Sequence, residues 1–370
     1  MNGRRASVSA PVESITAAAY VVPTDDDPEQ DGTFTWTKTT AVVVQASGAG
    51  HTGLGWTYSA AAAASVVEDL LAPVVVGTAV ADVERSGEQM QMACRNVGPG
   101  GLAMHAVSAV DLALWDLKAR VAGCSLVDLL GAVRDEVPVY GSGGFTSLSD
   151  ERLAEQTRGW IKDGMTQIKI KVGRDPRADR DRLELVREAA GDDVALYVDA
   201  NGGYQRAEAA KWAEEYARAG VTWFEEPLTS DDLGGLRWLR GKAPGGLAIA
   251  AGEYVDRLDA ARLMLAAEAV DVLQLDATRC GGITGFLAAA ALARAHHVDV
   301  SAHCAPAAHT AVAAACPNLR HLEWFHDHVR IERLLFDGAP GATGGSVALD
   351  RSTTGNGLSL SPTANDWKKP

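Results

Sequence analysis

The sequence contains no apolar run that approaches the roughly 18 residues needed to span a membrane as a helix. Its longest apolar stretches, such as Phe286–Ala293, have the length of short helical segments. The first 14 residues carry basic and small side chains but no apolar core of a secretory signal. We therefore expect residues 1–14 to be a disordered tail and the protein to be cytoplasmic.

Cysteines are few, and their spacing follows no known framework. The five cysteines, at positions 94, 124, 280, 304 and 316, are scattered and include no CxxC pair. This pattern is typical of reduced thiols in a cytoplasmic protein and not of a set of disulfides.

Basic residues are also in short supply. The chain has 34 Lys and Arg against 48 Asp and Glu, which gives a net charge of −14 and a pI near 5.1. Nucleic acids and anionic membranes require a basic surface, so neither is expected as a partner. A small anionic substrate remains compatible with this charge, because a bound metal and a few lysines reverse the local field.

Most of the chain alternates between short β-rich runs and helical stretches. At 370 residues it is too long for one ordinary core, so two domains are expected. From about residue 138, helical stretches separate short β-rich runs at 137–140, 167–171, 195–199, 221–224, 247–250, 272–275, 298–301 and 322–324. Eight such units predict a parallel α/β fold, and their number favours a closed (β/α)8 TIM-type barrel over an open sheet.

The first third of the chain reads differently. Two β-rich runs, 40–45 and 54–58, predict an antiparallel hairpin, and helices are predicted at about 60–72 and 102–122. These elements indicate an α+β domain. We therefore divide the chain into an α+β domain over 15–134, a barrel over 135–332, and a C-terminal segment over 333–370 that returns to the first domain.

Two loops of the first domain have more than one interpretation. Gly48–Gly53 matches the GxGxxG pattern of dinucleotide sites, but that function needs a helix directly afterwards, so a hairpin turn is favoured. Residues 24–34 are acidic and rich in structure-breaking residues. They form either a solvated surface loop or a lid over the barrel mouth, with Phe34 or Trp36 closing on a substrate.

Three carboxylates stand at the ends of three successive predicted strands, namely Asp199, Glu225 and Glu253. They are 26 and 28 residues apart, about one strand-helix unit each. The carboxyl ends of barrel strands converge on one mouth, so these side chains are expected to meet there. Because like charges repel in a cleft and all-oxygen ligands suit a hard cation, the pattern predicts one Mg²⁺ ion.

Lys169 and Lys171 lie two residues apart on one predicted strand, so their side chains point to the same face. A parallel barrel strand is covered on both faces, which argues against a solvent-facing alternation. We expect both ammonium groups near the mouth, where each lowers the pKa of the other. A lysine with a lowered pKa is a usable base near neutral pH.

Asp276 and His303 end the sixth and seventh predicted strands, again about one unit apart. A carboxylate beside an imidazole orients the ring and raises its basicity, so we interpret the pair as functional. Glu323, on the eighth strand, forms either a salt bridge to the basic groups or, if protonated, a hydrogen bond to a developing oxyanion. The three histidines within 321–328 are expected to point toward solvent and not to form a transition-metal cluster.

Taken in order, these motifs resemble the enolase superfamily, specifically its mandelate racemase-like subgroup. The resemblance rests on Lys169-x-Lys171, Asp199-x-Asn201, Glu225-Glu226-Pro227, Gly252-Glu253, Asp276 with His303, and Glu323. It extends from the hairpin domain through the eighth strand. It implies a modified (β/α)7β barrel, an α+β domain that caps the mouth, and a homo-oligomer.

The resemblance also implies a chemistry. Asp199, Glu225 and Glu253 would hold one Mg²⁺ ion, and the substrate would be a 2-hydroxy carboxylate that loses its α-proton to give a metal-stabilised ene-diolate. Subsequent loss of a 3-hydroxyl is dehydration to a 2-keto-3-deoxy acid, whereas reprotonation from the other side is racemisation or epimerisation. We predict dehydration of an aldonate or aldarate, with a racemase as the alternative.

The resemblance assigns roles to the other motif residues. Lys169 would assist the substrate carboxylate, and Glu323 would bond its oxygen across from the metal. Lys171 and the Asp276–His303 dyad would face opposite sides of the α-carbon. The dyad disfavours a cycloisomerase of the lysine–lysine type, and the complete polar set disfavours a non-catalytic binding protein.

Substrate contacts are expected from six residues of both domains: Asn201, Glu226, Arg279, Trp36, His51 and Tyr58. The cap residues among them have polar tips that suit a polyhydroxy chain. Arg279 departs from the racemase prototype, which has a lysine three residues after the dyad aspartate. An arginine cannot act as a base, so this departure disfavours a direct transfer of racemase activity.

Overall fold

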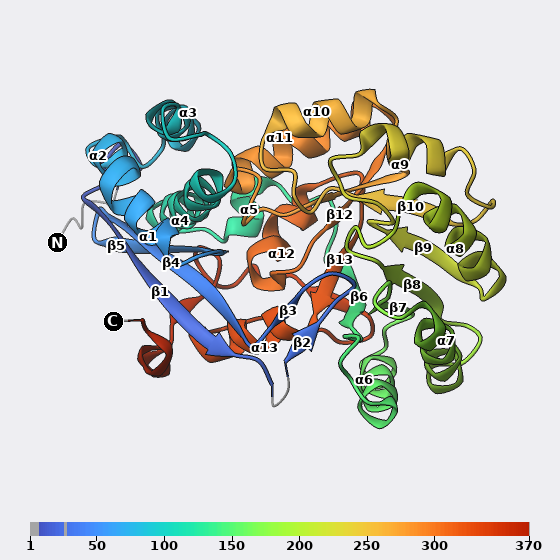
Figure 1. The fold of residues 1–370 in the computed structure, drawn as a ribbon. Coiled ribbons are helices and arrows are strands. Elements are labelled where there is room, and N and C mark those ends of the chain that lie inside the picture. The colour runs from blue at the N-terminus through green and yellow to red at the C-terminus, as the bar shows by residue number, and fades with distance from the viewer. Residues whose placement is uncertain (1–6, 26–27, 370) are drawn as a thin grey trace.

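The computed structural model describes residues 7–25 and 28–369. In it, a three-stranded sheet with its helices is followed by a barrel, and the last part of the chain runs back along both (Figure 1). The fold class predicted from the sequence is confirmed.

The start of the chain is ordered over more of its length than expected. Val12 is buried, and its N–H donates to the Thr78 carbonyl oxygen at 2.8 Å. The N–H of Val80 donates in turn to the carbonyl oxygen of Ala10 at 2.9 Å. The prediction of a disordered tail is therefore wrong for residues 8–14, because Val12 fills an apolar site; residues 1–6 lie outside the described part of the chain.

The N-terminal sheet is antiparallel, in the order β1 (Ser14–Pro23), β4 (Lys38–Gly48), β5 (His51–Tyr58). The β4–β5 turn lies at Ala49 and Gly50, both with positive φ (53° and 78°). Two such residues match the twist of a tight hairpin. The stretch Gly48–Gly53 is thus a hairpin turn, as predicted.

The helices of this domain are α1 (Ala62–Val66), the π-helical η1 (Val67–Leu71), α2 (Ala72–Val75), α3 (Val83–Cys94), α4 (Leu102–Ala122) and α5 (Leu126–Leu130). The predicted helix at 60–72 is a continuous run, and its π turn ends two residues before Pro73, a residue that has no N–H to donate. Helix α4 agrees with its predicted bounds and packs between β5 and the barrel helix α11 (Gly282–Ala295).

Eight parallel strands close into the barrel through pairing of the first with the last. They are β6 (Glu136–Gly143), β7 (Gln167–Lys171), β8 (Ala195–Asp199), β9 (Val221–Glu225), β10 (Ala248–Ala251), β11 (Val272–Leu275), β12 (Asp299–Ala302) and β13 (Leu319–Phe325). The outer helices are α6 (Asp150–Lys162), α7 (Pro176–Ala190), α8 (Arg206–Arg218), α9 (Leu233–Arg240), α10 (Leu258–Ala266), α11 and α12 (Pro306–Ala315). All eight predicted strands are found within a few residues of their expected positions.

Aromatic side chains fill the barrel below its mouth. Tyr140, Tyr197 and Trp223 are buried there, and His321 packs among them with Nδ1 at 2.9 Å from the hydroxyl of Ser301. Burial lowers the pKa of His321 to about 3, so the ring is neutral. The expectation that His321 points to solvent is wrong, because it occupies an inward position of β13.

The C-terminal segment contacts both parts of the molecule. Its elements are α13 (His326–Leu335), β14 (Phe336–Asp337), β15 (Ser346–Ala348), β16 (Ser359–Leu360) and η2 (Pro362–Trp367). Strand β15 pairs antiparallel with β6 of the barrel. Phe336 packs on Trp56 of β5 with ring centroids 4.5 Å apart, and the N–H of Asn356 donates to Asp116 of α4 at 2.6 Å. The four-part division of the chain stays a prediction, and these contacts support a returning segment.

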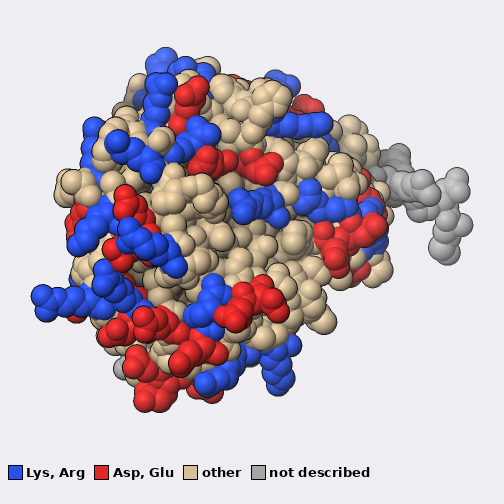
Figure 2. All heavy atoms as spheres, turned by 90° about the vertical axis from the view of Figure 1, so that its right-hand side faces the viewer, with Lys and Arg blue, Asp and Glu red and all other residues tan. Residues whose placement is uncertain are grey.

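Charges of both signs are interspersed on the outer face of the barrel (Figure 2). On α7 and α8, Arg180 pairs with Glu215 at 3.0 Å and Arg218 with Glu214 at 3.0 Å. Such exposed pairs contribute little to stability, so the barrel is held mainly by its apolar interior. Within the described residues, no helix combines the length and apolarity that crossing a membrane requires.

Helix α4 lies directly on the backbone of β5, and the close approach depends on glycine. A Cβ on Gly55 would stand 2.2 Å from the Ala109 carbonyl oxygen. We expect Gly55→Ala to lower the free energy of unfolding by about 3 kcal/mol through overpacking, as measured by urea denaturation. The matched control is Gly159→Ala on the exposed face of α6, where a Cβ meets nothing and alanine favours the helix. Equal midpoints for the two variants would contradict this packing.

Candidate active site at the barrel mouth

Three carboxylates meet where the barrel strands end. Asp199 is the last residue of β8, Glu225 is the last of β9, and Glu253 follows β10 by two residues. One oxygen from each lies within 4.8 Å of the others, and all three side chains are buried. The sequence prediction that these side chains converge is therefore confirmed.

A glycine places the third carboxylate. Gly252 has a φ of +130°, and a Cβ there would stand 2.4 Å from the Gln274 carbonyl oxygen on the neighbouring strand. The chain can bend away from β10 at this point only without a side chain. Glu253 is thereby turned over the mouth.

Both lysines of β7 reach the same group of carboxylates. Lys169 Nζ donates to Glu225 and lies 2.8 Å from Glu323 Oε1 and 3.6 Å from Asp199 Oδ2. Lys171 Nζ donates to Asp199 Oδ2 at 2.5 Å. Both ammonium groups therefore contact the same cluster of carboxylates. This agrees with the prediction that the two lysine side chains point to the same face of the strand.

The lysine pKa values differ from expectation. Burial lowers the pKa of Lys171, but the Asp199 carboxylate outweighs both burial and the neighbouring Lys169, so the pKa is raised. The pKa of Lys169 is raised as well, because Glu225 and Glu323 outweigh its burial. The prediction that the neighbouring cations lower these pKa values is wrong for this arrangement of groups, since the carboxylates stand closer.

The donor set fits a hard divalent cation. Burial and the nearby Asp199 carboxylate raise the pKa of Glu225 to about 8, which reflects crowding of negative charge. The Oε2 atom of Glu253 is buried without a hydrogen-bond partner. Three converging carboxylate oxygens, one of them without a donor, are what Mg²⁺ prefers as protein ligands.

The predicted dyad is formed on the next two strands. His303 follows β12, and its Nδ1 donates to Asp276 Oδ2 at 2.9 Å. A second oxygen of Asp276 accepts from the N–H of Thr278 at 2.7 Å, which fixes the carboxylate. Burial lowers the pKa of His303, but Glu253, Glu323 and Asp276 together raise it. The ring therefore presents Nε2, a basic atom, to the mouth.

Glu323 is held as a carboxylate. It accepts from Ser142 Oγ at 2.5 Å and from the N–H of Cys304 at 3.0 Å, and it pairs with Lys169 at 2.8 Å. Burial raises its pKa, but Lys169 outweighs that effect, so the pKa lies below its usual range. Two interpretations of Glu323 were open. In this structure Glu323 forms a salt bridge as a carboxylate and is not a protonated hydrogen-bond donor.

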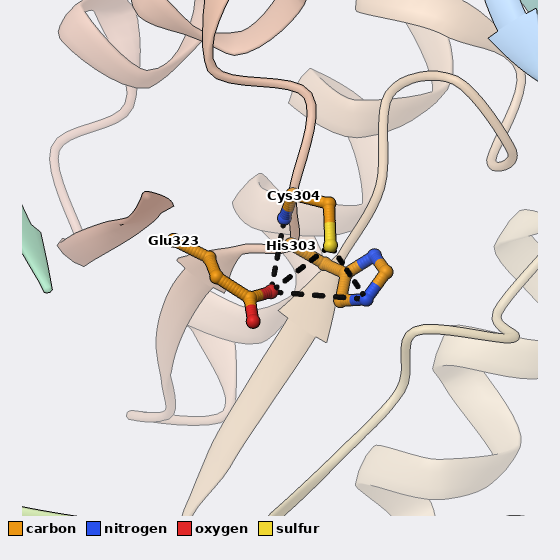
Figure 3. Close-up of side chains that lie close together, drawn as sticks. All are labelled: His303, Cys304 and Glu323. Carbon is orange, nitrogen blue, oxygen red and sulfur yellow. Dashed lines mark hydrogen bonds and ion pairs between the residues drawn. The ribbon is translucent and has the colours of Figure 1, made fainter. Parts of the chain in front are cut away.

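Cys304 was missed by the sequence reasoning. Its thiol lies 3.2 Å from His303 Nε2 and donates to Glu323 Oε2 at 3.3 Å (Figure 3). Successive residues of a strand normally point to opposite faces, but Cys304 has a φ of +53°, which turns its side chain toward the histidine. Its position directly after a strand-end histidine was the only signal available.

A cavity of about 560 Å³ opens above these groups. Lys171, His303, Asn201 and Arg279 line its floor, and Trp36 and Tyr58 belong to its walls. The side-chain oxygen of Asn201 is buried without a partner, and the guanidinium of Arg279 lies 3.5 Å from Glu253 and 3.5 Å from Asp276. Sequence reasoning missed other wall residues, namely Lys38, Thr39, Tyr254, Asp327 and His328.

Two residues predicted to contact the substrate do not line this cavity. His51 is exposed at the opposite end of β5 from Tyr58, roughly 24 Å away along an extended strand. Glu226 is buried next to Glu225, and its side chain accepts a hydrogen bond from Ser230. Burial and the Glu253 charge raise the pKa of Glu226 well above its usual value. The predicted cavity contact is wrong for His51, whereas a contact between Glu226 and the substrate stays a prediction.

The loop predicted as a possible lid lies over the mouth. Between β2 (Glu29–Gln30) and β3 (Thr35–Trp36), Thr33 Oγ1 donates to the Asn201 carbonyl oxygen at 3.3 Å. Trp36 packs edge-on against Phe145, whereas Phe34 is exposed. For the described residues 28–34 the lid interpretation fits; Asp26 and Asp27 lie outside the described part of the chain.

Another part of the cavity wall joins the two domains. Tyr58 of β5 stacks on His328 of α13 with ring centroids 3.5 Å apart. His328 was expected to point to solvent, but it is buried, because α13 begins directly at the mouth. Burial lowers its pKa well below the usual value, so it presents a neutral ring.

Comparisons with known proteins agree with this geometry. Residues 14–131 match the family model "Mandelate racemase / muconate lactonizing enzyme, N-terminal domain", and residues 152–365 match "Enolase C-terminal domain-like". L-talarate/galactarate dehydratase of Salmonella typhimurium is 33% identical over 86% of this chain and 79% of its own length. 3,6-Anhydro-alpha-L-galactonate cycloisomerase of Streptomyces coelicolor is 33% identical over 81% of this chain and 86% of its own.

Solved structures extend the comparison. A mandelate racemase/muconate lactonizing enzyme-like protein from Rubrobacter xylanophilus superimposes with a TM-score of 0.95 at 48% identity, covering 97% of this chain and 99% of that one. The Salmonella dehydratase, crystallised with Mg and L-lyxarohydroxamate, gives 0.90 at 28% identity over 100% of this chain and 96% of its own. The chain therefore belongs to the mandelate racemase/muconate lactonizing enzyme family of the enolase superfamily.

Proposed function

We propose that this protein is a Mg²⁺-dependent dehydratase of an acid sugar, an aldonate or an aldarate, that produces a 2-keto-3-deoxy acid. The observation that carries the proposal is the placement of two potential bases, Lys171 and His303, on the floor of one cavity beside three converging carboxylates. Relatives named as talarate/galactarate, rhamnonate and gluconate dehydratases support the substrate class.

Asp199, Glu225 and Glu253 would hold the Mg²⁺ ion. When bound, the ion supplies Lewis-acid stabilisation of the negative charge that develops on the substrate carboxylate as the α-proton leaves. Lys169, fixed between Glu225 and Glu323, adds a positive charge next to that carboxylate. Because these groups are buried and held by each other, they need little reorganisation during the reaction.

The proton transfers fall to Lys171 and His303. Either group would take the α-proton, according to the configuration at carbon 2, once Mg²⁺ engages Asp199 and Glu253, the carboxylates that raise the pKa values of Lys171 and His303. Departure of the 3-hydroxyl requires a proton on its oxygen, which a protonated His303 is placed to deliver from Nε2. The C–H and C–O bonds break, water leaves, and the resulting enol becomes the 2-keto acid. Asp276 keeps the ring oriented throughout by accepting from Nδ1.

A racemase or epimerase of a 2-hydroxy acid is the second candidate, and the two-base arrangement favours it. Removal of the α-proton by one base and its return by the other inverts carbon 2 without loss of water. Arg279 weakens this alternative, because its guanidinium faces Asp276 and Glu253 and cannot exchange protons at neutral pH. The dehydratase therefore remains the favoured proposal.

A substrate screen tests the function. Purified protein with Mg²⁺ is incubated with a library of aldonic and aldaric acids, and of their lactones, and 2-keto acids are detected with semicarbazide. We expect at least one acid sugar to yield a 2-keto product. A library without keto product but with α-deuterium incorporation and inversion in D₂O would replace the dehydratase by the racemase.

Removal of one carboxylate tests the metal site without any substrate. We expect Mg²⁺ to stabilise the wild type against thermal unfolding, by about 2.7 kcal/mol at a hundredfold excess over Kd. Glu253→Gln should lose most of this stabilisation, because it removes the charge of a ligand carboxylate whose Oε2 accepts no hydrogen bond. Glu214→Gln, on the exposed face of α8, is the matched control. A response of Glu253→Gln equal to that of the control would place the ion elsewhere.

Substitution of the dyad tests the assignment of the bases. His303→Asn should slow turnover about 10²–10⁴-fold for substrates whose α-proton faces the dyad, since general acid–base catalysis is lost. Exchange of the α-proton with D₂O, followed by NMR, should persist for the opposite configuration, where Lys171 is the base. Lys171→Met should show the reverse preference. Unchanged exchange for both configurations in His303→Asn would disprove the dyad as a base.

A further inference from the structure

A second set of potential metal ligands lies beside the three carboxylates. His303 Nε2, Cys304 Sγ and Glu323 Oε2 are 3.2 Å (N to S), 3.3 Å (S to O) and 3.7 Å (N to O) apart (Figure 3). Imidazole nitrogen, thiolate sulfur and carboxylate oxygen are the ligand types of protein-bound Zn²⁺. Around a tetrahedral Zn²⁺ ion such atoms stand about 3.4–3.6 Å apart. The three atoms are thus nearly in position to share one ion.

The outer contacts of this set are also those of a metal site. A histidine that binds a metal usually donates its other N–H to a carboxylate, which orients the ring. His303 does so through Nδ1 to Asp276 at 2.9 Å. Glu323 is held at Oε1 by Ser142 and Lys169, so Oε2 is the oxygen directed at the sulfur. Two of the three ligands are therefore fixed before any ion binds.

The set is rigid and still accessible. His303 and Cys304 follow β12 and Glu323 lies on β13, so adjacent barrel strands hold all three. Their side chains are buried, yet His303 and Cys304 line the cavity above the mouth, which provides a path for entry. Glu253 Oε2 lies 3.4 Å from His303 Nε2, so the two ligand sets are adjacent, but they share no residue.

We propose that His303, Cys304 and Glu323 form a second cation site, selective for a soft or borderline ion such as Zn²⁺ and separate from the hard-ion site of Asp199, Glu225 and Glu253. Mg²⁺ disfavours a sulfur ligand, whereas Zn²⁺ and Co²⁺ accept one. Coordination replaces the thiol proton of Cys304 and, where His303 is protonated, the proton on its Nε2, and these protons pass to solvent.

Occupation of the site has a consequence for the enzyme. The ion takes the lone pair of His303 Nε2, which in the proposed reaction accepts or delivers a proton. Bound Zn²⁺ is therefore an inhibitor that acts without displacing Mg²⁺. This consequence rests on the proposed function, but the site itself does not, because it is defined by ligand geometry.

Cobalt spectroscopy tests the site without any substrate. The full-length protein is saturated with Mg²⁺ to fill the carboxylate site, and Co²⁺ is then titrated. A thiolate bound to Co²⁺ gives a charge-transfer band in the near ultraviolet, which oxygen ligands do not give. We expect this band to saturate at one equivalent in the wild type and to be lost in Cys304→Ser. Cys124→Ser is the matched control and should retain it, because that thiol lies away from the cavity, 3.9 Å from the Ala119 carbonyl oxygen.

The outcomes separate the alternatives. Co²⁺ binding without a thiolate band overturns the proposal, as does a band that survives Cys304→Ser and so comes from another cysteine. Should Cys304→Ser fail to fold, X-ray absorption of the Zn²⁺-loaded wild type decides: one sulfur at about 2.3 Å supports the site, and an all-oxygen and nitrogen shell overturns it. None of these results depends on turnover, so they stand even where the substrate screen finds no dehydratase activity.

Discussion

The balance of buried charge at the carboxyl ends of the strands is the constraint on which the site depends. Five carboxylates converge there: Asp199, Glu225, Glu253, Asp276 and Glu323. Three basic side chains stand among them: Lys169, Lys171 and Arg279. Charges without partners are costly to bury, so a divalent cation at the strand ends brings the two sides into balance. Burial and the same crowding raise the pKa of Glu225 to about 8, and the crowded carboxylates raise the pKa values of both lysines.

Much of this arrangement is predictable from the sequence, because a barrel converts linear spacing into spatial convergence. Asp199 and Glu225 end their strands at the predicted residues, and the parallel register carries them to one mouth. The errors arise where convergence depends on tertiary contacts. His51 was chosen for its chemistry, but an extended strand carries it away from the mouth. Cys304 was overlooked because its left-handed backbone, and not its position in the alternation, decides where the thiol points. The sign of the lysine pKa shifts likewise depends on distances to carboxylates that a sequence does not contain.

The two domains divide the work of the site between chemistry and shape. Every group assigned to proton transfer or metal binding comes from the barrel, whereas β5 and the 28–36 hairpin supply walls of the cavity. The wall that contains Tyr58 is fixed, since Tyr58 stacks on the buried His328 and α4 packs directly against the glycines of β5. The hairpin is anchored at Thr33 but leaves Phe34 exposed. A change of substrate preference is therefore more readily achieved through the hairpin than through β5, because substitutions in β5 disturb the packing between the domains.

The carboxylate ligands of a hard ion and the proposed ligands of a soft ion lie side by side, and His303 therefore has two competing roles. Its basicity comes from the surrounding carboxylates, which raise its pKa against the effect of burial. A nitrogen made basic in this way is also a better metal ligand. The adjacent thiol of Cys304 adds a sulfur ligand, which makes the site bind soft ions more tightly than hard ones. The features that make the histidine a catalyst thus also make it a target for Zn²⁺. Replacing the thiol of Cys304 by an oxygen or a methyl group would reduce the affinity for soft ions and leave the contact between His303 and Asp276 unchanged. The preference for soft ions therefore depends on one side chain, and the proposed proton transfers do not require that side chain.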